Sequence, residues 1–231
     1  MDRSLSLVRP LAAALLLGTL LLAAGAVVHP VLPHAAAAQL RMIADFPHWR
    51  TVHLLMLAGS GLVAAGIWVR LLLDGPDVAG SSGVMVGALA LIAVGITLNT
   101  LNIAFMAGAG TQMAALYREG DTAIVRVFES THPIGLMAAR FGNFLAALGA
   151  LVLGALEWER AHSRTGRLLA LLAWAAAAGG LAGALVFDEA SRLALAAVAL
   201  LAGWQVVVGV IGLRSPGRSV TRVNRSVVSD S

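Results

Sequence analysis

The stretch GVMVGALALIAVGITLNTLNIAFMA, residues 83–107, decides the fold because its 25 residues include no charged side chain. A helix rises about 1.5 Å per residue, so about 20 apolar residues cross the hydrocarbon core of a bilayer. A charge-free run of this length is too long for an ordinary core helix of a soluble domain. It predicts a helix that spans a membrane.

Five further segments have the same pattern and length. The six predicted spans are 10–28, 51–69, 83–107, 133–156, 168–187 and 193–213. Only the fourth contains a formal charge, Arg140. The sequence therefore predicts an all-α, polytopic membrane protein with a single domain, 1–213, built as a six-helix transmembrane bundle. The first segment, with Arg3 and Arg9 before its apolar run, could be read as a signal peptide, but the run exceeds a usual signal-peptide core, and we expect it to be retained.

The composition agrees with a membrane protein and excludes several classes of site. Of 231 residues, 59% are hydrophobic and 12% are charged, whereas soluble domains carry about 25% charged residues. The chain has no cysteine, which excludes disulfides, thiolate metal sites and cysteine nucleophiles. All sixteen basic residues are arginine, and their placement follows membrane topology, so the net charge of +4 does not indicate nucleic-acid binding.

The arginines predict the orientation of the chain, since cytoplasmic loops carry an excess of basic residues. An N-terminus inside the cell puts ten arginines on the cytoplasmic side and five on the outer side. The cytoplasmic ten are Arg3, Arg9, Arg70, Arg160, Arg164, Arg167, Arg214, Arg218, Arg222 and Arg225; the outer five are Arg41, Arg50, Arg118, Arg126 and Arg192. We expect the protein in the inner (plasma) membrane of a bacterium, with both termini in the cytoplasm. We also expect residues 214–231 to form a disordered basic tail.

The two longest connections, 29–50 and 108–131, both lie on the predicted outer side. Each contains apolar residues at helical spacing, which predicts short amphipathic helices lying in the interface. These apolar sets are Leu40, Ile43 and Phe46, and Ile124, Val127 and Phe128. Such loops either cover a site or simply pack over the helix ends, and the sequence leaves both open.

Five of the six histidines also fall on this outer side, and imidazole is a common ligand of metals and of haem iron. His29 and His34 lie in a proline-broken segment and are expected as exposed loop residues. His48 and His53 are five residues apart, so they do not share a helix face. The spacing contains no recognised metal-binding motif.

His53 and His132 are expected near the same membrane depth, because each lies near the outer end of a span that runs inward. If those two helices are neighbours, the imidazoles could hold a haem b between them. The alternative is that both are interfacial histidines bonded to water and lipid headgroups.

Arg140 is predicted about two turns inside the fourth span, which begins at Pro133, where an arginine is costly unless it is paired, solvated or able to reach the interface. The predicted spans contain no acidic residue to balance it. The counter-charge is therefore expected from an outer-loop acid, from lipid headgroups or from a bound anion. The outer-loop candidates are Asp45, Glu129 and Asp188.

Polar residues near Arg140 fall on helical stripes. One contains His132, Arg140 and Asn143, and another contains Asn99 and Asn102 on the third span. Buried amides need hydrogen-bond partners, so these groups are expected to face each other or a ligand. The alternative is that the asparagines only join helices.

Small residues at four-residue spacing are assigned to close helix contacts. They are Gly142, Ala146, Ala150 and Gly154 on the fourth span, and Gly179 and Gly183 on the fifth.

These patterns leave four functions open. The first is electron transfer with quinone, with haem b on His53 and His132 and its propionates meeting Arg140, Asn99, Asn102 or Asn143. The second is binding or transport of an anionic amphiphile or lipid on Arg140 without a cofactor. The third is a copper or zinc site on the outer histidines, expected at His48, His53 and His132. The fourth is an accessory subunit of a larger membrane complex.

Overall fold

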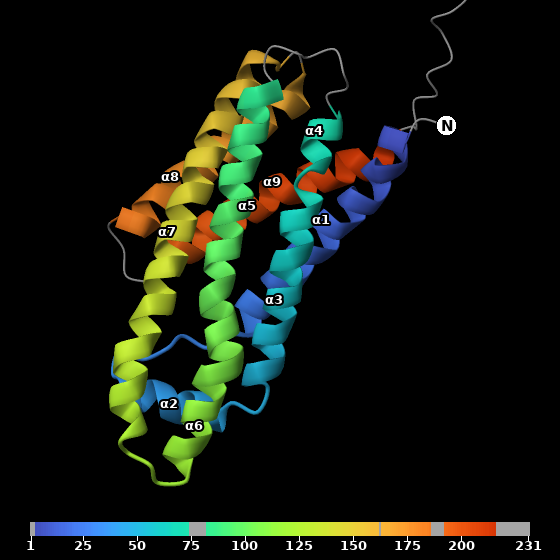
Figure 1. The fold of residues 1–231 in the computed structure, drawn as a ribbon. Coiled ribbons are helices and arrows are strands. Elements are labelled where there is room, and N and C mark those ends of the chain that lie inside the picture. The colour runs from blue at the N-terminus through green and yellow to red at the C-terminus, as the bar shows by residue number, and fades with distance from the viewer. Residues whose placement is uncertain (1–2, 74–81, 162, 186–191, 216–231) are drawn as a thin grey trace, which may run out of the picture.

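A computed structural model describes residues 3–73, 82–161, 163–185 and 192–215. Every regular element in these ranges is a helix, which confirms the predicted all-α class (Figure 1). The helices are α1 (Arg3–Val28), α2 (Ala36–Asp45), α3 (Trp49–Gly66), α4 (Val69–Leu73), α5 (Ser82–Phe105), the π-helix η1 (Met106–Gly110), α6 (Thr111–Arg118), α7 (Ile124–Glu159), α8 (Arg164–Leu185) and α9 (Arg192–Arg214). Of the predicted tail 214–231, residues 216–231 lie outside the described residues, and Arg214 is the last residue of α9.

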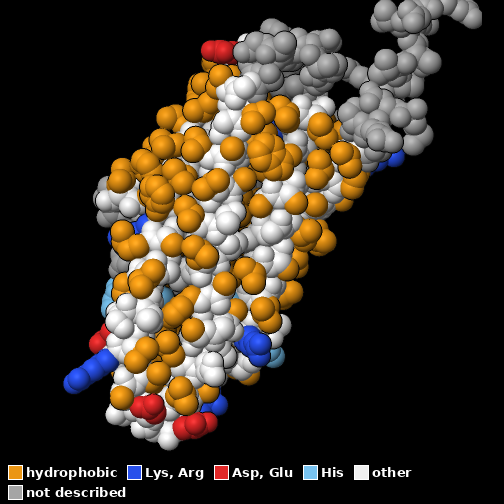
Figure 2. Space-filling model, in the orientation of Figure 1, with side chains coloured by type: hydrophobic (Ala, Val, Ile, Leu, Met, Phe, Trp, Pro, Cys, Tyr) orange, Lys and Arg blue, Asp and Glu red, His pale blue; other side chains and the backbone are white. Residues whose placement is uncertain are grey.

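Five helical segments of the described chain are long and apolar enough to cross a membrane. They are Leu7–Val28, Trp49–Leu73, Gly83–Arg118, Ile124–Glu159 and Arg164–Leu185. In α9 the apolar part with described side chains is the shorter Ala199–Arg214. Figure 2 shows hydrophobic side chains spread along the shaft of the molecule, with most of the visible charged side chains near one end. The structure is thus compatible with a multi-pass membrane protein, while the sixth span and the interfacial placement of short helices stay predictions.

The six long helices form a ring in the order of the chain. Packing joins α1 to α3, α3 to α5, α5 to α7, α7 to α8 and α8 to α9, and α9 returns to α1. In Figure 1, α5 lies between α3 and α7, while α8, α9 and α1 cross obliquely. This arrangement encloses an interior to which every long helix contributes.

One half of that interior is a packed apolar core. Trp204 of α9 and Leu153 of α7 are buried there with residues from α1, α3, α4, α5 and α8. At the other end, α2 and α6 form what we call the cap, where Leu40, Trp49 and Phe128 belong to a second buried cluster. Apolar side chains therefore fill the half of the interior near α4, and a separate buried cluster lies at the end formed by the cap.

The π-helix η1 connects the cap to α3. A π-helix shifts the hydrogen-bond register by one residue and is found mostly as a single turn within a longer helix. The carbonyl of Met106 accepts hydrogen bonds from the indole Nε1 of Trp49 at 3.1 Å and from the hydroxyl of Thr111 at 2.9 Å. Trp49 thereby ties the start of α3 to the point where α5 passes into α6.

Glycine allows α5 and α7 to approach until their backbones touch. A Cβ atom on Gly95 would overlap the carbonyl oxygen of Gly142, and a Cβ on Gly142 would overlap that of Gly95. A Cβ on Gly149 would lie 2.5 Å from the carbonyl oxygen of Ala88. The assignment of Gly142 to a close helix contact is confirmed.

The fourth predicted span begins at Pro133, but the helix that contains it begins earlier. The helix α7 begins at Ile124, after a turn in which the Asp121 carboxylate accepts a hydrogen bond from the backbone N–H of Ala123 at 3.0 Å. Proline inside a helix removes an N–H hydrogen bond and crowds the preceding turn, and Pro133 is exposed on the outside of α7. The short helix predicted from Ile124 is therefore the first turn of α7, whereas the one predicted around Leu40 forms as α2.

A buried ion pair joins α4 to the last turn of α7. The guanidinium of Arg70 makes two hydrogen bonds to the Glu157 carboxylate, from Nε to Oε1 and from an Nη atom to Oε2 at 2.9 Å. The two side chains are only 8% and 4% exposed. The sequence placed Arg70 on the cytoplasmic side, and Glu157 directly follows the fourth predicted span; the structure buries the two side chains against each other.

Candidate functional site

A cavity of about 210 Å³ lies between α5, α7, α8 and α9, in the half of the ring that the apolar core does not fill. Its wall combines three polar side chains with small or aliphatic ones. The polar members are Asn102, Arg140 and Asn143, and the others are Leu136, Ala139, Ala146, Ala147, Ala150, Ala176, Gly179, Gly180, Gly183 and Leu201. Gly179 and Gly183, predicted as a helix contact, also line this space.

The helix α7 supplies Arg140 and Asn143 from neighbouring positions on one face. Arg140 is partly buried and lies near the middle of the helix. Asn143 accepts a hydrogen bond at its Oδ1 from Nδ2 of Asn99 on α5, at 3.3 Å. The two predicted polar stripes therefore meet across the α5–α7 contact, and Asn99 acts there as a link between helices.

Asn102 reaches the same cavity from α5. Its Oδ1 atom is buried and has no hydrogen-bond partner in the described structure. A Cβ on Gly135 would lie 2.7 Å from this oxygen, so only glycine leaves room for the amide. An unsatisfied buried carbonyl costs about 1–3 kcal/mol, which makes this group an available hydrogen-bond acceptor.

Neither of the two described acids predicted to balance Arg140, Asp45 and Glu129, lines the cavity. Asp45 is exposed on α2, and Glu129 is exposed on α7. Asp188 lies outside the described residues. The cavity wall itself contains no acidic side chain among the described residues that line it.

His132 is buried in α7 between two aromatic rings. Its ring lies 5.9 Å from that of Phe105 in a stacked pair and 4.6 Å from that of Phe128. Its Nε2 atom is buried without a hydrogen-bond partner among the described groups. His132 therefore occupies an aromatic pocket of α5 and α7, not the rim of a helix.

His53 is buried in a different aromatic group. Its ring lies 4.3 Å from that of Trp49 and 5.0 Å from that of His29. Nδ1 of His53 lies 2.8 Å from the backbone carbonyl oxygen of Trp49. His29, predicted as an exposed loop residue, is in fact partly buried in this group, and its burial lowers its pKa while a hydrogen bond to the backbone of Pro30 opposes that shift.

The structure does not bring the three predicted metal ligands together. Because α5 lies between α3 and α7, no ring contact between described residues joins His53 to His132. His48 is exposed and packs edge-on against Phe46 at 6.4 Å. In the described ranges, no three histidine or acidic side chains are grouped to hold a metal ion. The haem b hypothesis stays a prediction, and this geometry does not favour it.

Comparisons with models of protein families, with curated proteins and with solved structures gave no match. The functional assignment therefore rests on the cavity and on the side chains that line it.

Proposed function

We propose that this protein binds an anionic amphiphile, a molecule with an apolar chain and a carboxylate or phosphate group, in the cavity between α5, α7, α8 and α9. The observation that carries the proposal is the composition of the wall. Arg140 is the one charged group among the described residues that line it, two asparagine amides lie beside it, and the remaining surface is alanine, glycine and leucine. This matches a ligand that is charged at one end and apolar elsewhere.

The chemistry of Arg140 supports an anionic group. A guanidinium presents paired N–H donors that fit carboxylate and phosphate oxygens two at a time. Away from water such a contact is electrostatically stronger than at a surface. Asn143 and Asn102 add amide groups on the same wall, so a bound headgroup would find hydrogen-bond partners as well as charge. An arginine within a membrane helix is itself a reason to expect a functional site.

The size of the cavity limits the ligand. An apolar cavity of about 150 Å³ holds one benzene molecule, and pockets that enclose a drug-sized ligand measure about 300–1,000 Å³. A space of about 210 Å³ therefore suits a headgroup and a few methylene groups, with the rest of the chain lying outside. A haem macrocycle, which is much larger than benzene, would not fit this space.

The proposal predicts that decanoate stabilises the protein more than decanol, which has the same chain length without the charge. A ligand at 100 times its dissociation constant raises the free energy of unfolding by about 2.7 kcal/mol. Replacing Arg140 with glutamine should remove most of this increase for decanoate and leave the response to decanol unchanged. The measurement is thermal unfolding of the purified protein in an uncharged detergent, with each additive in turn.

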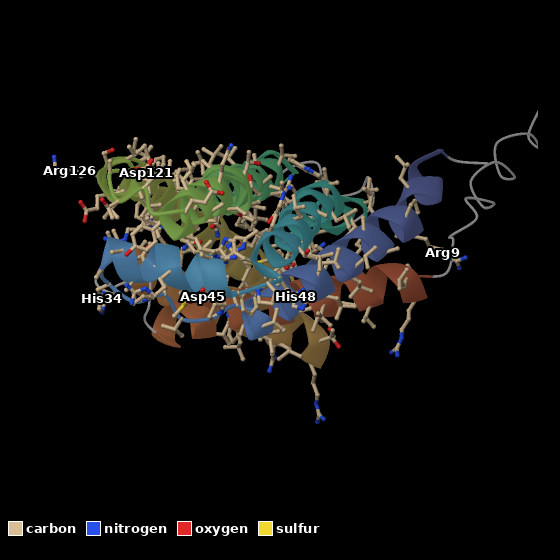
Figure 3. The ribbon with its side chains drawn as sticks, turned by 90° about the horizontal axis from the view of Figure 1, so that it is seen from below. Arg9, His34, Asp45, His48, Asp121 and Arg126 are labelled. Atoms are coloured by element: carbon tan, nitrogen blue, oxygen red, sulfur yellow. The ribbon has the colours of Figure 1, made fainter. Side chains whose placement is uncertain are left out.

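Arg126→Gln is the matched control, because Arg126 belongs to the same helix but extends away from the protein at the cap (Figure 3). It should respond to decanoate as the wild type does. Equal stabilisation by decanoate and decanol, or an unchanged decanoate response in Arg140→Gln, would contradict the proposal.

A further inference from the structure

A second group of side chains, separate from the cavity, joins the end of α1 to the start of α3 near the cap. His29, Trp49 and His53 form a triangle of rings whose centres lie 4.9 Å, 4.3 Å and 5.0 Å apart. Trp49 and His53 are buried at 2% and 3% exposure, and His29 is partly exposed. An imidazole that directly follows α1 and another from α3 thus meet beside an indole, at a position open on one side.

His53 is oriented by a backbone carbonyl, because its Nδ1 donates a hydrogen bond to the carbonyl oxygen of Trp49 at 2.8 Å. Histidines that bind metals almost always donate their other ring N–H in this way, which leaves the second nitrogen with its lone pair for the metal. The His53 ring is therefore held in the tautomer that a metal requires.

The separation of the two rings fits one shared ion. A metal–nitrogen bond is about 2.0–2.1 Å long, and the ring centre lies roughly 1.1 Å behind the nitrogen. At ligand angles between those of four-ligand and three-ligand ions, about 109–120°, two imidazoles on one ion therefore have centres about 5–5.5 Å apart. The observed distance between the His29 and His53 centres is 5.0 Å.

A thioether lies in the next layer of the same helix pair. Met56 follows His53 by three residues on α3 and packs on Gly25, which precedes His29 by one turn on α1. A Cβ on Gly25 would overlap the Met56 side chain and lie 3.0 Å from its Sδ, so glycine at this position makes room for the sulfur. Long side chains in helices point toward the helix N-terminus, which for Met56 is the direction of His53.

We propose that His29 and His53 bind Cu(I), with the Met56 thioether as a third ligand. Two imidazoles and a thioether form a soft donor set that suits Cu(I), whereas Zn²⁺ favours a fuller set with thiolate, imidazole or carboxylate. The adjacent face of Trp49 also favours a bound cation. The site differs from the one expected from the sequence, because His29 replaces His48 and His132.

The test is anaerobic titration of the full-length protein in detergent with Cu(I), in competition with the chromogenic chelator bicinchoninate. The wild type should bind one Cu(I) per chain. His29→Gln and His53→Gln should each weaken binding by more than about 100-fold, since losing a residue that only orients a ligand already costs about 10–100-fold. Met56→Leu should weaken Cu(I) binding and leave any Zn²⁺ binding unchanged.

His48→Gln is the matched control, because His48 lies on the same side of the molecule but is exposed and outside the ring triangle. It should bind Cu(I) as the wild type does. His29→Gln is the decisive variant, since His29 is only partly buried, and its thermal unfolding reports whether the fold is intact. No stoichiometric Cu(I) in the wild type, wild-type affinity in His29→Gln, or tight Zn²⁺ binding without Cu(I) would overturn the proposal.

Discussion

Replacing Glu157 with glutamine is expected to lower the free energy of unfolding by about 3–5 kcal/mol. The change removes the carboxylate that accepts two hydrogen bonds from Arg70 and so breaks a buried ion pair. Both side chains are almost fully enclosed, so water cannot replace the lost partner without opening the packing between α4 and α7. Thermal unfolding in detergent, compared with the wild type, measures the effect.

Two further variants separate loss of the pair from loss of a charge. Glu159→Gln changes an exposed residue two positions away on α7 and should alter stability by no more than about 0.5 kcal/mol. Arg70→Met combined with Glu157→Met removes both charges and should recover most of the stability lost in Glu157→Gln, because a buried ion pair can often be replaced by apolar side chains. A double variant as unstable as Glu157→Gln would show that the lost stability does not come from breaking this buried ion pair.

Replacing Gly95 with alanine is expected to destabilise the protein by about 1–3 kcal/mol or more, although alanine is the better helix former. The added methyl group would overlap the carbonyl oxygen of Gly142, and a backbone atom cannot rotate out of the way as a side chain can. Relief requires α5 and α7 to separate. Thermal unfolding should therefore show a clear decrease in the melting temperature.

Gly87→Ala is the control on the same helix, since a Cβ on Gly87 would meet no atom within 4 Å. It should be neutral or stabilising by up to about 1 kcal/mol, because alanine costs less conformational entropy in a helix. If both alanine variants behaved alike, the close backbone contact between α5 and α7 would not limit stability.

The helices could be predicted from the sequence because long apolar runs in a chain with few charges have few other solutions. The start of α7 could not be predicted, because proline is common at the first position of a helix. Only the structure shows that Pro133 lies inside a helix that begins at Ile124. The pairing of Arg70 with Glu157 was also missed. Each residue directly follows a predicted span. That they meet depends on the packing of α4 against the end of α7, which only the structure shows.

The candidate site was partly predictable for a similar reason. Arg140 and Asn143 share a face of one helix, and helical spacing alone places them together. The cavity depends also on Gly179 and Gly183 from α8, which the same kind of spacing assigned to a close contact. Small residues on one helix either touch a neighbouring helix or leave a space, depending on the side chains that face them. The spacing of residues along one helix does not reveal those facing side chains. The approach of His29 to His53 likewise depends on how α1 and α3 pair.

The ring order of the helices has a consequence for how the protein is made. Each long helix packs on the one synthesised before it, but α9 must return to α1, where Gln205 accepts a hydrogen bond from Thr19 across the joint at 2.9 Å. The ring therefore stays open until α9 has packed against α1. The α5–α7 pair can form before α8 and α9 add the wall that contains Leu201. A nascent chain without α9 would thus have no complete pocket, and the proposed ligand would bind only after α9 has packed.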